Sequence, residues 1–343
     1  MNVEPVNPWI LIPELAAARR PPDAVLINDV ALREGEQNEG ISFSQDLKVE
    51  LGLALERAGI RQIQVGYPGR FSRDGAATRA VKEAVGITVV EVIALAFVDD
   101  WQEEIDACLE CGADIVTIVY RSSERLHRLL GVTPAEAIER AQAAVARASR
   151  GPCLVGFLPS DSTRADPRFL GELWRAAAAA GAQRVYVADS MGAATPELVA
   201  RLVTLAREAT GLPVGIHCHN DFGLVVANTL AGVNAGAEIV DVAVNGLGDR
   251  AGNAPLEEVV AALELLYGIE TGVELGSLTE LSRLFARAAG RPLHPHKPIT
   301  GPAAFVHTLP THKAAIQADS RSIQAFEPEV VGNVQRLEER IDA

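Results

Sequence analysis

The sequence predicts an α/β fold, a (β/α)₈ TIM barrel followed by a small, mostly helical C-terminal subdomain. Three observations support this prediction. Short β-branched runs alternate with alanine-rich stretches of helical period through most of the 343 residues. Eight such units over about 250 residues match the usual size of a TIM barrel. The first strand-to-helix turn also lacks the GxGxxG loop that is typical of an open doubly wound sheet.

The predicted strands are short runs of apolar and β-branched residues, each ending at a polar or glycine-marked loop. They cover residues 25–30, 61–67, 88–97, 114–120, 153–159, 184–189, 214–220 and 239–246. The predicted helices lie between the strands and repeat apolar residues at helical period. They lie near residues 44–58, 74–85, 100–111, 134–149, 167–180, 196–209, 223–235 and 255–267. A helix between successive strands predicts a parallel sheet with right-handed crossovers.

Several predicted helix ends carry the residues that helix ends favour. Thr133 and Thr195 each precede a proline, which is the pattern of an N-cap followed by proline at the first helical position. Other helices end on a glycine, where a left-handed residue is favoured. These glycines are Gly59, Gly112, Gly181, Gly211 and Gly236.

We expect three parts in the chain. Residues 1–24 form an N-terminal extension, residues 25–270 form the barrel, and residues 271–343 form the C-terminal subdomain. One further helix is predicted at 277–290, and a proline- and histidine-rich segment follows it. Apolar residues such as Phe305 persist beyond this helix, so we expect the subdomain to be folded.

The composition excludes several classes of function. Hydrophobic residues make up 48% of the chain and charged residues 22%, which is ordinary for a globular protein with a buried core. The net charge of −14 argues against nucleic acid or an anionic membrane as partner, because both require a basic surface. We find no apolar run of about 18 residues and no signal peptide. We therefore expect a cytoplasmic protein.

The four cysteines do not suggest a disulfide framework in a chain of this length. Cys108 and Cys111 form a CxxC pair near the end of a predicted helix, just before Gly112. Neither a second cysteine pair nor a nearby histidine completes a metal site there. We interpret both cysteines as residues that pack the helix.

Polar side chains follow three of the predicted strands, at the barrel end where active sites lie. They are Asp29, Arg33, Glu34 and Gln37 after the first strand, His217, His219 and Asp221 at the seventh, and Asn245, Asp249, Arg250 and Asn253 after the eighth. The first strand neighbours the eighth only if the sheet closes. The candidate site and the closed barrel therefore support each other.

His217 and His219 are two residues apart on a predicted strand, so their imidazoles point to the same side. If that side is the barrel interior, Cys218 points toward the helices. Together with Glu34 the histidines form a 2-His-1-carboxylate set for a divalent metal, which could be Zn, Mn, Mg, Co or Fe. The alternative is a pair of hydrogen-bonded structural histidines.

Arg33 lies directly beside the candidate ligand Glu34. A guanidinium next to a Lewis acid suits a substrate with a carboxylate or a developing alkoxide. The alternative is an ion pair between Arg33 and Asp29 that braces the loop.

Three segments carry a resemblance to a known family. NDVALREGEQ, HCHNDFGLVVANTLAGVNAGAEIVDVAVNGLGDRAGN and KPITGPAAF with its later histidine resemble the isopropylmalate, homocitrate and citramalate synthases, which condense acyl-CoA on a metal. The same superfamily includes hydroxymethylglutaryl-CoA lyase. The resemblance runs from about residue 25 to about residue 335. It is greatest to short forms such as homocitrate synthase or phosphono- and phosphinomethylmalate synthase.

The resemblance implies roles for the candidate residues. Glu34, His217 and His219 match the metal ligands, and Asn253 matches an asparagine in or near the metal's shell. Arg33 matches the arginine that grips the 2-oxo acid. Gln37 lies beside that arginine and is taken as a substrate-binding residue, and Ser190 stands where a threonine commonly contacts the substrate carboxylate.

The resemblance also implies a homodimer and a base. His312 matches a histidine that reaches the active site of the partner subunit, so the C-terminal subdomain contributes to catalysis. The implied biosynthetic reaction joins acetyl-CoA to a 2-oxo acid, and thioester hydrolysis then releases CoA and a 2-alkylmalate-type or homocitrate-type acid. We expect an oxo acid with an anionic side chain, such as 2-oxoglutarate or a phosphono- or phosphinopyruvate.

Arginines past the ends of the second and fourth strands could bind the distal anionic group. They are Arg70, Arg73, Arg121 and Arg125, with Arg121 taken as a substrate-binding residue. The alternative for each is a solvated loop arginine.

The chain departs from the family pattern at several positions. Ser160 stands where relatives usually carry a glutamate that assists the base, and Asp161 beside it should point elsewhere. HTLPTH ends at His312 where HESGIH is common, and Gln64 replaces a usual glutamate. Because the chain ends at residue 343, we expect no regulatory domain.

Two other functions remain open at this point. The first is a carbon–carbon lyase or aldolase on the same barrel, although the GLGDRAGN loop lacks the cysteine that the lyases carry there. The second is a metal-binding barrel without catalytic activity, which Ser160 alone favours.

Overall fold

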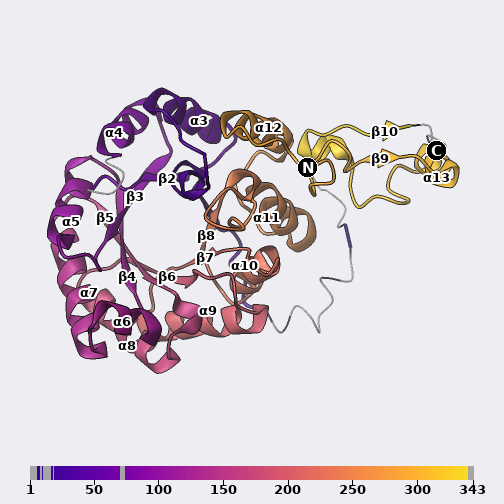
Figure 1. Ribbon diagram of the computed structural model, residues 1–343. Helices are drawn as coiled ribbons and strands as arrows, with labels where there is room; N and C mark the ends of the chain where they lie inside the picture. Colours follow the sequence, from indigo (N-terminus) through magenta and orange to yellow (C-terminus); the bar gives the residue numbers. More distant parts are fainter. Residues whose placement is uncertain (1–5, 8–9, 11–16, 18, 70–73, 339–343) are drawn as a thin grey trace.

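The computed structural model describes residues 6–7, 10, 17, 19–69 and 74–338 of the chain. Eight parallel strands close into a barrel, which Figure 1 shows from one end. The strands are β1 (Leu26–Asp29), β2 (Gln62–Gly66), β3 (Val89–Leu95), β4 (Ile115–Arg121), β5 (Leu154–Ser160), β6 (Arg184–Asp189), β7 (Val214–Cys218) and β8 (Ile239–Val242). The predicted fold class and all eight predicted strands are confirmed, with ends shifted by a few residues.

The barrel closes through the pairing of β1 with β8. Leu26 lies opposite Ile239 and Asp29 lies opposite Val242 in this parallel pair. The main apolar core lies between the sheet and the helices, while a small second cluster that includes Leu158 lies apart from it. Residues two apart on a strand share a face, so alternate residues of each strand point into the barrel. Many of these inward side chains are polar.

The eight predicted helices are also present, around the outside of the barrel (Figure 1). They are α3 (Gln45–Arg57), α4 (Gly75–Ala84), α5 (Trp101–Glu110), α7 (Pro134–Ala148), α8 (Pro167–Ala179), α9 (Pro196–Thr210), α10 (Val225–Asn234) and α11 (Leu256–Ala262), the last continued by the π-helical turn η5 (Leu263–Tyr267).

The predicted helix ends are confirmed. The Thr133 side chain accepts the amide hydrogen of Glu136 in a capping box, and Thr195 accepts that of Leu198. All five predicted glycines have positive φ, between 67° and 114°. A Cβ at such a position would be strained, so these glycines allow the chain to leave each helix toward the next strand.

Short helical segments that the periodicity did not predict lie in the loops after the strands. They are α2 (Ala31–Glu34), η2 (Gly35–Gln37), α6 (Glu124–Leu130), η3 (Ser162–Arg164) and η4 (Val244–Gly246). Each has seven residues or fewer, which is too short for apolar periodicity to be recognised. They belong to the barrel end where the candidate residues lie.

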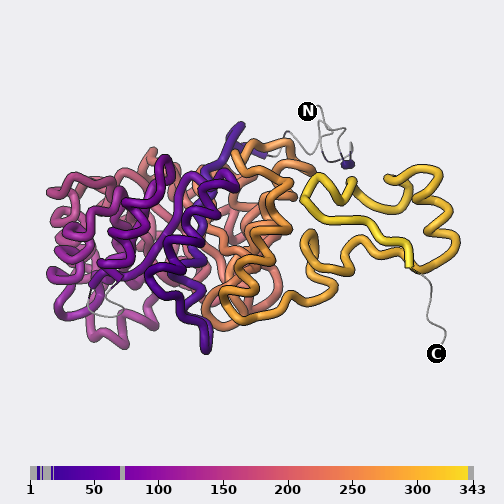
Figure 2. The backbone as a smooth tube through the Cα atoms, turned by 90° about the horizontal axis from the view of Figure 1, so that it is seen from above, coloured from indigo at the N-terminus to yellow at the C-terminus, as the bar shows by residue number. Residues whose placement is uncertain are grey.

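The chain after the barrel first packs on it and then leaves it. Helix α12 (Leu278–Ala288), near the predicted position, follows the turn η6 (Leu275–Ser277) and lies against the barrel. Residues 291–338 are here called the C-terminal arm. Lys297 pairs with Glu257 and Glu258 and so anchors the base of the arm to α11, while the outer part of the arm, with α13, projects away from the barrel (Figures 1 and 2). The arm is less helical than the sequence predicts. It contains α13 (Pro310–Ala318), the turn η7 (Pro328–Val331) and a parallel pair, β9 (Val306–His307) and β10 (Arg336–Leu337).

Two further sequence interpretations can be compared with the structure. Cys108 and Cys111 are buried in the main core and donate their thiol hydrogens to the carbonyls of Ile93 and Cys108, respectively. Both therefore pack helix α5, as expected. No helix in the described ranges has the length and apolarity needed to cross a membrane.

Candidate metal centre

The loop after β1 carries Glu34 into the barrel. Asp29, at the end of β1, accepts the amide hydrogens of Ala31 at 2.9 Å and of Val244 at 3.0 Å. One carboxyl group thus ties the end of β1 both to the first residue of α2 and to the chain that follows β8. Because of this tie, the fourth residue of α2, Glu34, is buried with 3% of its surface exposed.

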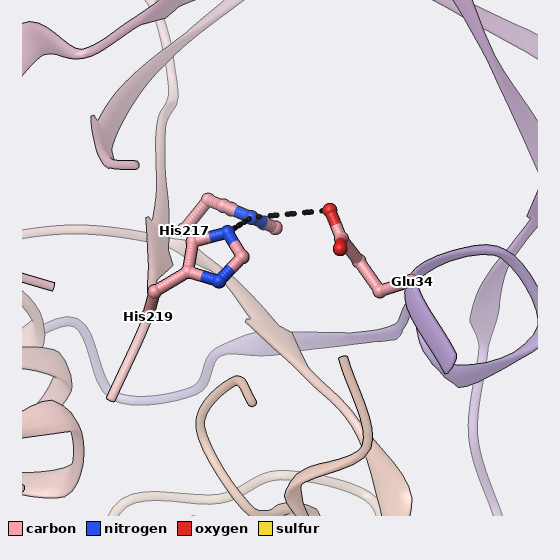
Figure 3. Close-up of side chains that lie close together, drawn as sticks. All are labelled: Glu34, His217 and His219. Carbon is pink, nitrogen blue, oxygen red and sulfur yellow. Dashed lines mark hydrogen bonds and ion pairs between the residues drawn. The ribbon is translucent and has the colours of Figure 1, made fainter. Parts of the chain in front are cut away.

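His217 and His219 come from the end of β7 and meet Glu34 across β8, the strand between β7 and β1 (Figure 3). The two Nε2 atoms lie 3.3 Å apart, and Glu34 Oε1 lies 3.6 Å from Nε2 of His217. Cys218 between them belongs to the main core with the helices, as predicted. Asn253 joins the group through its Nδ2 atom, 3.2 Å from Nε2 of His217.

The donor set fits a divalent metal. Two ligand atoms each about 2.1 Å from one ion and about 100° apart lie about 3.2 Å from each other, close to the distance between the two Nε2 atoms. Two oxygen atoms at the site, Glu34 Oε2 and Asn253 Oδ1, are buried without a hydrogen-bond partner among the described residues, which suits a bound cation.

The protonation states also suit metal binding. Burial lowers the pKa of His219 to about 4, and the neighbouring His217 adds to this effect, so the imidazole is neutral at pH 7. Burial acts to raise the pKa of Glu34, but Arg33 and His217 outweigh it and hold that pKa below its ordinary value. The site therefore offers a carboxylate and a neutral imidazole, the forms that bind metal.

Asp241 on β8 forms a hydrogen bond with His217. Its Oδ2 atom lies 3.0 Å from Nδ1 of His217, so Nδ1 donates its hydrogen and Nε2 is left with a lone pair for a metal. Asp241 was not among the residues predicted from the sequence. The available signal was an aspartate within a run of valine and isoleucine, at a position that faces the barrel interior.

Arg33 lies at the edge of the metal centre and has partners on β2. Its Nε donates to Gln64 Oε1 at 2.6 Å, its Nη1 donates to the Tyr67 hydroxyl at 3.0 Å, and Nη1 also pairs with Glu34. The alternative expectation, an ion pair with Asp29, is wrong, because Asp29 is used by backbone amides. Tyr67, whose ring lies under the guanidinium, was not predicted.

Gln37 is close to this group, whereas Ser190 contacts the chain after β5. Gln37 Nε2 lies 3.2 Å from the same Tyr67 hydroxyl that contacts Arg33. Ser190 follows β6, and its hydroxyl oxygen accepts the amide hydrogen of Asp161 at 2.8 Å. The hydroxyl hydrogen of Ser190 is therefore free to point elsewhere.

Arg121 is the last residue of β4, and its guanidinium lies 4.3 Å above the centre of the Phe97 ring. Within the described ranges we find no carboxylate that pairs with it. Arg125 is exposed in α6, while Arg70 and Arg73 lie outside the described residues.

Ser160 ends β5 at the position where the resemblance places a glutamate that assists the base, and Asp161 follows it. Asp161 is fully buried, with a left-handed backbone (φ 65°), and its carboxylate binds Arg164 at 2.7 and 2.9 Å. It therefore braces the turn after β5 and points away from the centre, as expected. Ser160 offers only a hydroxyl that bonds to the Tyr120 carbonyl.

His312 lies on α13, in the C-terminal arm, and is exposed. Both views place α13 well away from the barrel (Figures 1 and 2). His312 therefore does not join the metal centre of its own chain.

With this geometry established, comparisons with known proteins can be interpreted. The profile of the family described as HMGL-like matches residues 24–285, which is most of the chain. The chain belongs to the HMGL-like family. Its similarity to individual members extends further, into the C-terminal arm.

Three relatives show this. A homocitrate synthase of Methanopyrus kandleri is 37% identical over 91% of this chain and 78% of its own length. A probable 2-isopropylmalate synthase of the same organism is 40% identical, and an (R)-citramalate synthase of Methanocaldococcus jannaschii is 37% identical. The matches cover 92% and 91% of this chain, but only 63% of each of those two relatives. The predictions of this family and of a synthase-type enzyme are confirmed.

Solved structures of hydroxymethylglutaryl-CoA lyases share the fold. The lyase of Bacillus subtilis superposes with a TM-score of 0.70 at 20% identity, over 80% of this chain and 96% of that one. The lyase of Pseudomonas aeruginosa gives a TM-score of 0.67 at 23% identity, over 79% and 95% of the two chains. These similarities confirm the barrel of this HMGL-like chain.

Proposed function

We propose that this chain condenses acetyl-CoA with a 2-oxo acid and hydrolyses the thioester, giving a 2-alkylmalate-type or homocitrate-type acid and CoA. The observation that carries the proposal is the meeting of Arg33 with Glu34, His217 and His219 inside one barrel. Relatives that are homocitrate, isopropylmalate and citramalate synthases support the same reaction class.

Arg33 and the candidate metal ligands face the same oxo acid in this proposal. Glu34, His217 and His219, with Asn253 beside them, would hold a divalent metal, which would supply a Lewis acid for the oxo-acid carbonyl. Arg33 binds the carboxylate next to that carbonyl through its guanidinium. Gln64 and Tyr67 hold the guanidinium in place before the substrate binds, which lowers the entropy lost on binding.

Two neutral side chains complete the grip on this carboxylate. Ser190 donates the hydroxyl hydrogen that its bond to the Asp161 amide leaves free. Gln37 contacts the Tyr67 hydroxyl and so lies beside Arg33. Both add orientation without adding charge.

The substrate side chain is anionic in this proposal, as in 2-oxoglutarate or a phosphono- or phosphinopyruvate. The support is Arg121, which stands at the end of β4 over the Phe97 ring and has no carboxylate partner among the described residues. An unpaired guanidinium held flat on a ring presents its edge for bidentate contact with carboxylate or phosphonate.

The base comes from a second copy of the chain. His312 of a partner subunit takes a proton from the acetyl-CoA methyl group, and the resulting enolate adds to the oxo-acid carbonyl. Water then cleaves the thioester, so that CoA leaves as a thiol. The arm projects, and α13 lies far from its own barrel. This supports a homodimer in which the arm of each chain reaches the barrel of the other.

A thiol-release screen tests the proposal. The fully metallated protein is mixed with acetyl-CoA and oxo acids that carry short apolar, carboxylate or phosphonate side chains. We expect free CoA with at least one anionic oxo acid. Absence of CoA release across the whole panel would contradict the proposal, and cleavage of hydroxymethylglutaryl-CoA in its place would favour a lyase.

Arg121→Ala tests the side-chain preference. Losing one charge-assisted contact costs about 1.5–3 kcal/mol, so kcat/KM for the anionic oxo acid should fall about 10- to 150-fold. Arg128→Ala is the matched control, because Arg128 lies nearby on α6 in an exposed pair with Glu124. Equal kinetics for both variants would remove Arg121 from substrate recognition.

A further inference from the structure

A buried carboxylate lies in the barrel interior next to the metal centre. Glu91 on β3 is fully buried and accepts four hydrogen bonds from side chains on three other strands. Asn28 donates to it at 2.6 Å, Gln62 and Gln64 each donate at 3.1 Å, and the Thr117 hydroxyl donates to its other oxygen. None of the roles assigned above uses this carboxylate.

Gln64 connects Glu91 to the arginine that binds the oxo acid. Its amide oxygen accepts hydrogen bonds from Arg33, one of them 2.6 Å long, while its amide nitrogen donates to Glu91. An amide can accept on one side and donate on the other, whereas an ionised carboxylate can only accept. A glutamate at position 64 would accept from Arg33 but place a second carboxylate against Glu91.

Asn28 connects the same carboxylate to a metal ligand. Its Nδ2 atom donates both to Glu91 and, at 2.8 Å, to Asp241. Asp241 in turn holds Nδ1 of His217. The contacts form a closed ring, whose members in order are Glu34, Arg33, Gln64, Glu91, Asn28, Asp241 and His217.

We propose that Glu91 is a positioning residue that sets both Arg33 and His217, through Gln64 on one side and through Asn28 and Asp241 on the other. It touches neither substrate nor metal. Its negative charge orients the two amides so that Gln64 turns its oxygen to the guanidinium and Asn28 turns its nitrogen to Asp241. One buried charge thereby aligns Arg33, which binds the oxo acid, with the metal ligand His217.

Burial and a neighbouring carboxylate act against an ionised Glu91, and the donors around it act in favour of one. Burial and the nearby Asp241 raise the pKa of Glu91, while the Thr117 and Gln64 hydrogen bonds and the charge of Arg184 oppose that rise. Asp241 and Arg33 are the charged groups closest along the ring, and Arg184 reaches Glu91's neighbour Gln62 at 2.9 Å. The four side chains bonded to Glu91 all donate to it, so the local geometry gives its carboxylate the acceptor role that the proposal requires.

A double-mutant cycle on Gln64 and Glu91 tests this inference, which rests on the proposed function for its kinetic readout. Glu91→Gln removes the charge, and we expect about a 10- to 100-fold loss in oxo-acid affinity and in metal affinity. Gln64→Glu places two carboxylates together and should lose more. The double variant Gln64→Glu, Glu91→Gln again pairs one carboxylate with one amide, so it should recover part of the loss of Gln64→Glu.

Metal affinity by chelator competition and oxo-acid binding by calorimetry need no turnover, so they test Glu91 even if the condensation proposal fails. In kinetics, the KM for the oxo acid should rise while the KM for acetyl-CoA stays unchanged, which a loss of fold would not produce. Glu264→Gln, a half-buried glutamate bonded to Thr271 outside the barrel, is the matched control. Strictly additive losses in the cycle, or unchanged affinities in Glu91→Gln, would overturn the inference.

Discussion

His217 contacts a different carboxylate with each of its ring nitrogens. Asp241 takes the Nδ1 hydrogen at 3.0 Å, and Glu34 lies 3.6 Å from Nε2. A neutral imidazole has one donor and one acceptor, so the bond to Asp241 leaves the Nε2 lone pair for a cation. Alternation along a strand predicts that His217 and His219 share a face. Alternation does not predict the role of Asp241. His217 and Asp241 are 24 residues apart in the sequence, and only the register between β7 and β8 brings them together.

Metal binding should therefore stabilise the folded protein. At a free metal concentration 100 times its dissociation constant, the free energy of unfolding should rise by about 2.7 kcal/mol, since the unfolded chain does not assemble the three ligands. Thermal or chemical denaturation with and without a divalent metal measures this gain. Glu34→Gln and His219→Ala should abolish the gain, whereas Cys218→Ala, on the opposite face of β7, should retain it. An equal gain in all variants would place the metal elsewhere.

At the scale of elements, the strands and long helices could be predicted because each repeats its pattern over many residues. The five helix-ending glycines could also be predicted, since positive φ is a local property. The short α2 could not, because its start depends on Asp29 bonding to Val244, more than 200 residues away. Ser160 and Asp161 could be recognised as unusual from sequence, but the Arg164 brace appears only in the structure.

Glu56, near the end of α3, holds the turn between α4 and β3 and gives a pH-dependent prediction. Its partial burial acts to raise its pKa, but hydrogen bonds from the amides of Ile87, Gly86 and Thr88 outweigh this and lower the pKa to about 2. The folded pKa lies below the unfolded one, so the stabilising contribution is complete above the unfolded pKa. It is lost as the pH falls from about 5 toward 2.

Glu56→Gln should therefore destabilise the protein at pH 7 by about 1 kcal/mol, because the charged acceptor is lost from a partly exposed site. The difference from the unmodified chain should shrink as the pH is lowered. Urea denaturation at pH 7 and at pH 3.5 measures both values. Glu139→Gln, an exposed residue of α7, controls for general charge effects. A difference that grows on acidification would contradict the assignment.

In the whole molecule, the barrel and the C-terminal arm carry different groups of the proposed reaction. The barrel holds the metal ligands and Arg33, whereas the arm carries His312 on α13, well apart from that barrel (Figure 2). Several large apolar side chains of the arm are exposed, among them Leu309, Ile323 and Val334. Exposed apolar residues grouped on one projection are typical of a surface that another chain covers.

Exchange of arms predicts complementation between two inactive variants. Glu34→Ala removes the metal ligand and His312→Ala removes the proposed base, so neither homodimer has a complete site. In a mixed dimer, the barrel of the His312→Ala chain meets the intact His312 of the other chain. Random pairing makes half of the dimers mixed with one complete site each, so about a quarter of full activity should return on co-expression. Thiol release by the purified mixture measures this recovery. A mixture as inactive as its components would show that His312 does not act across the dimer, and full activity of His312→Ala alone would remove it from the reaction.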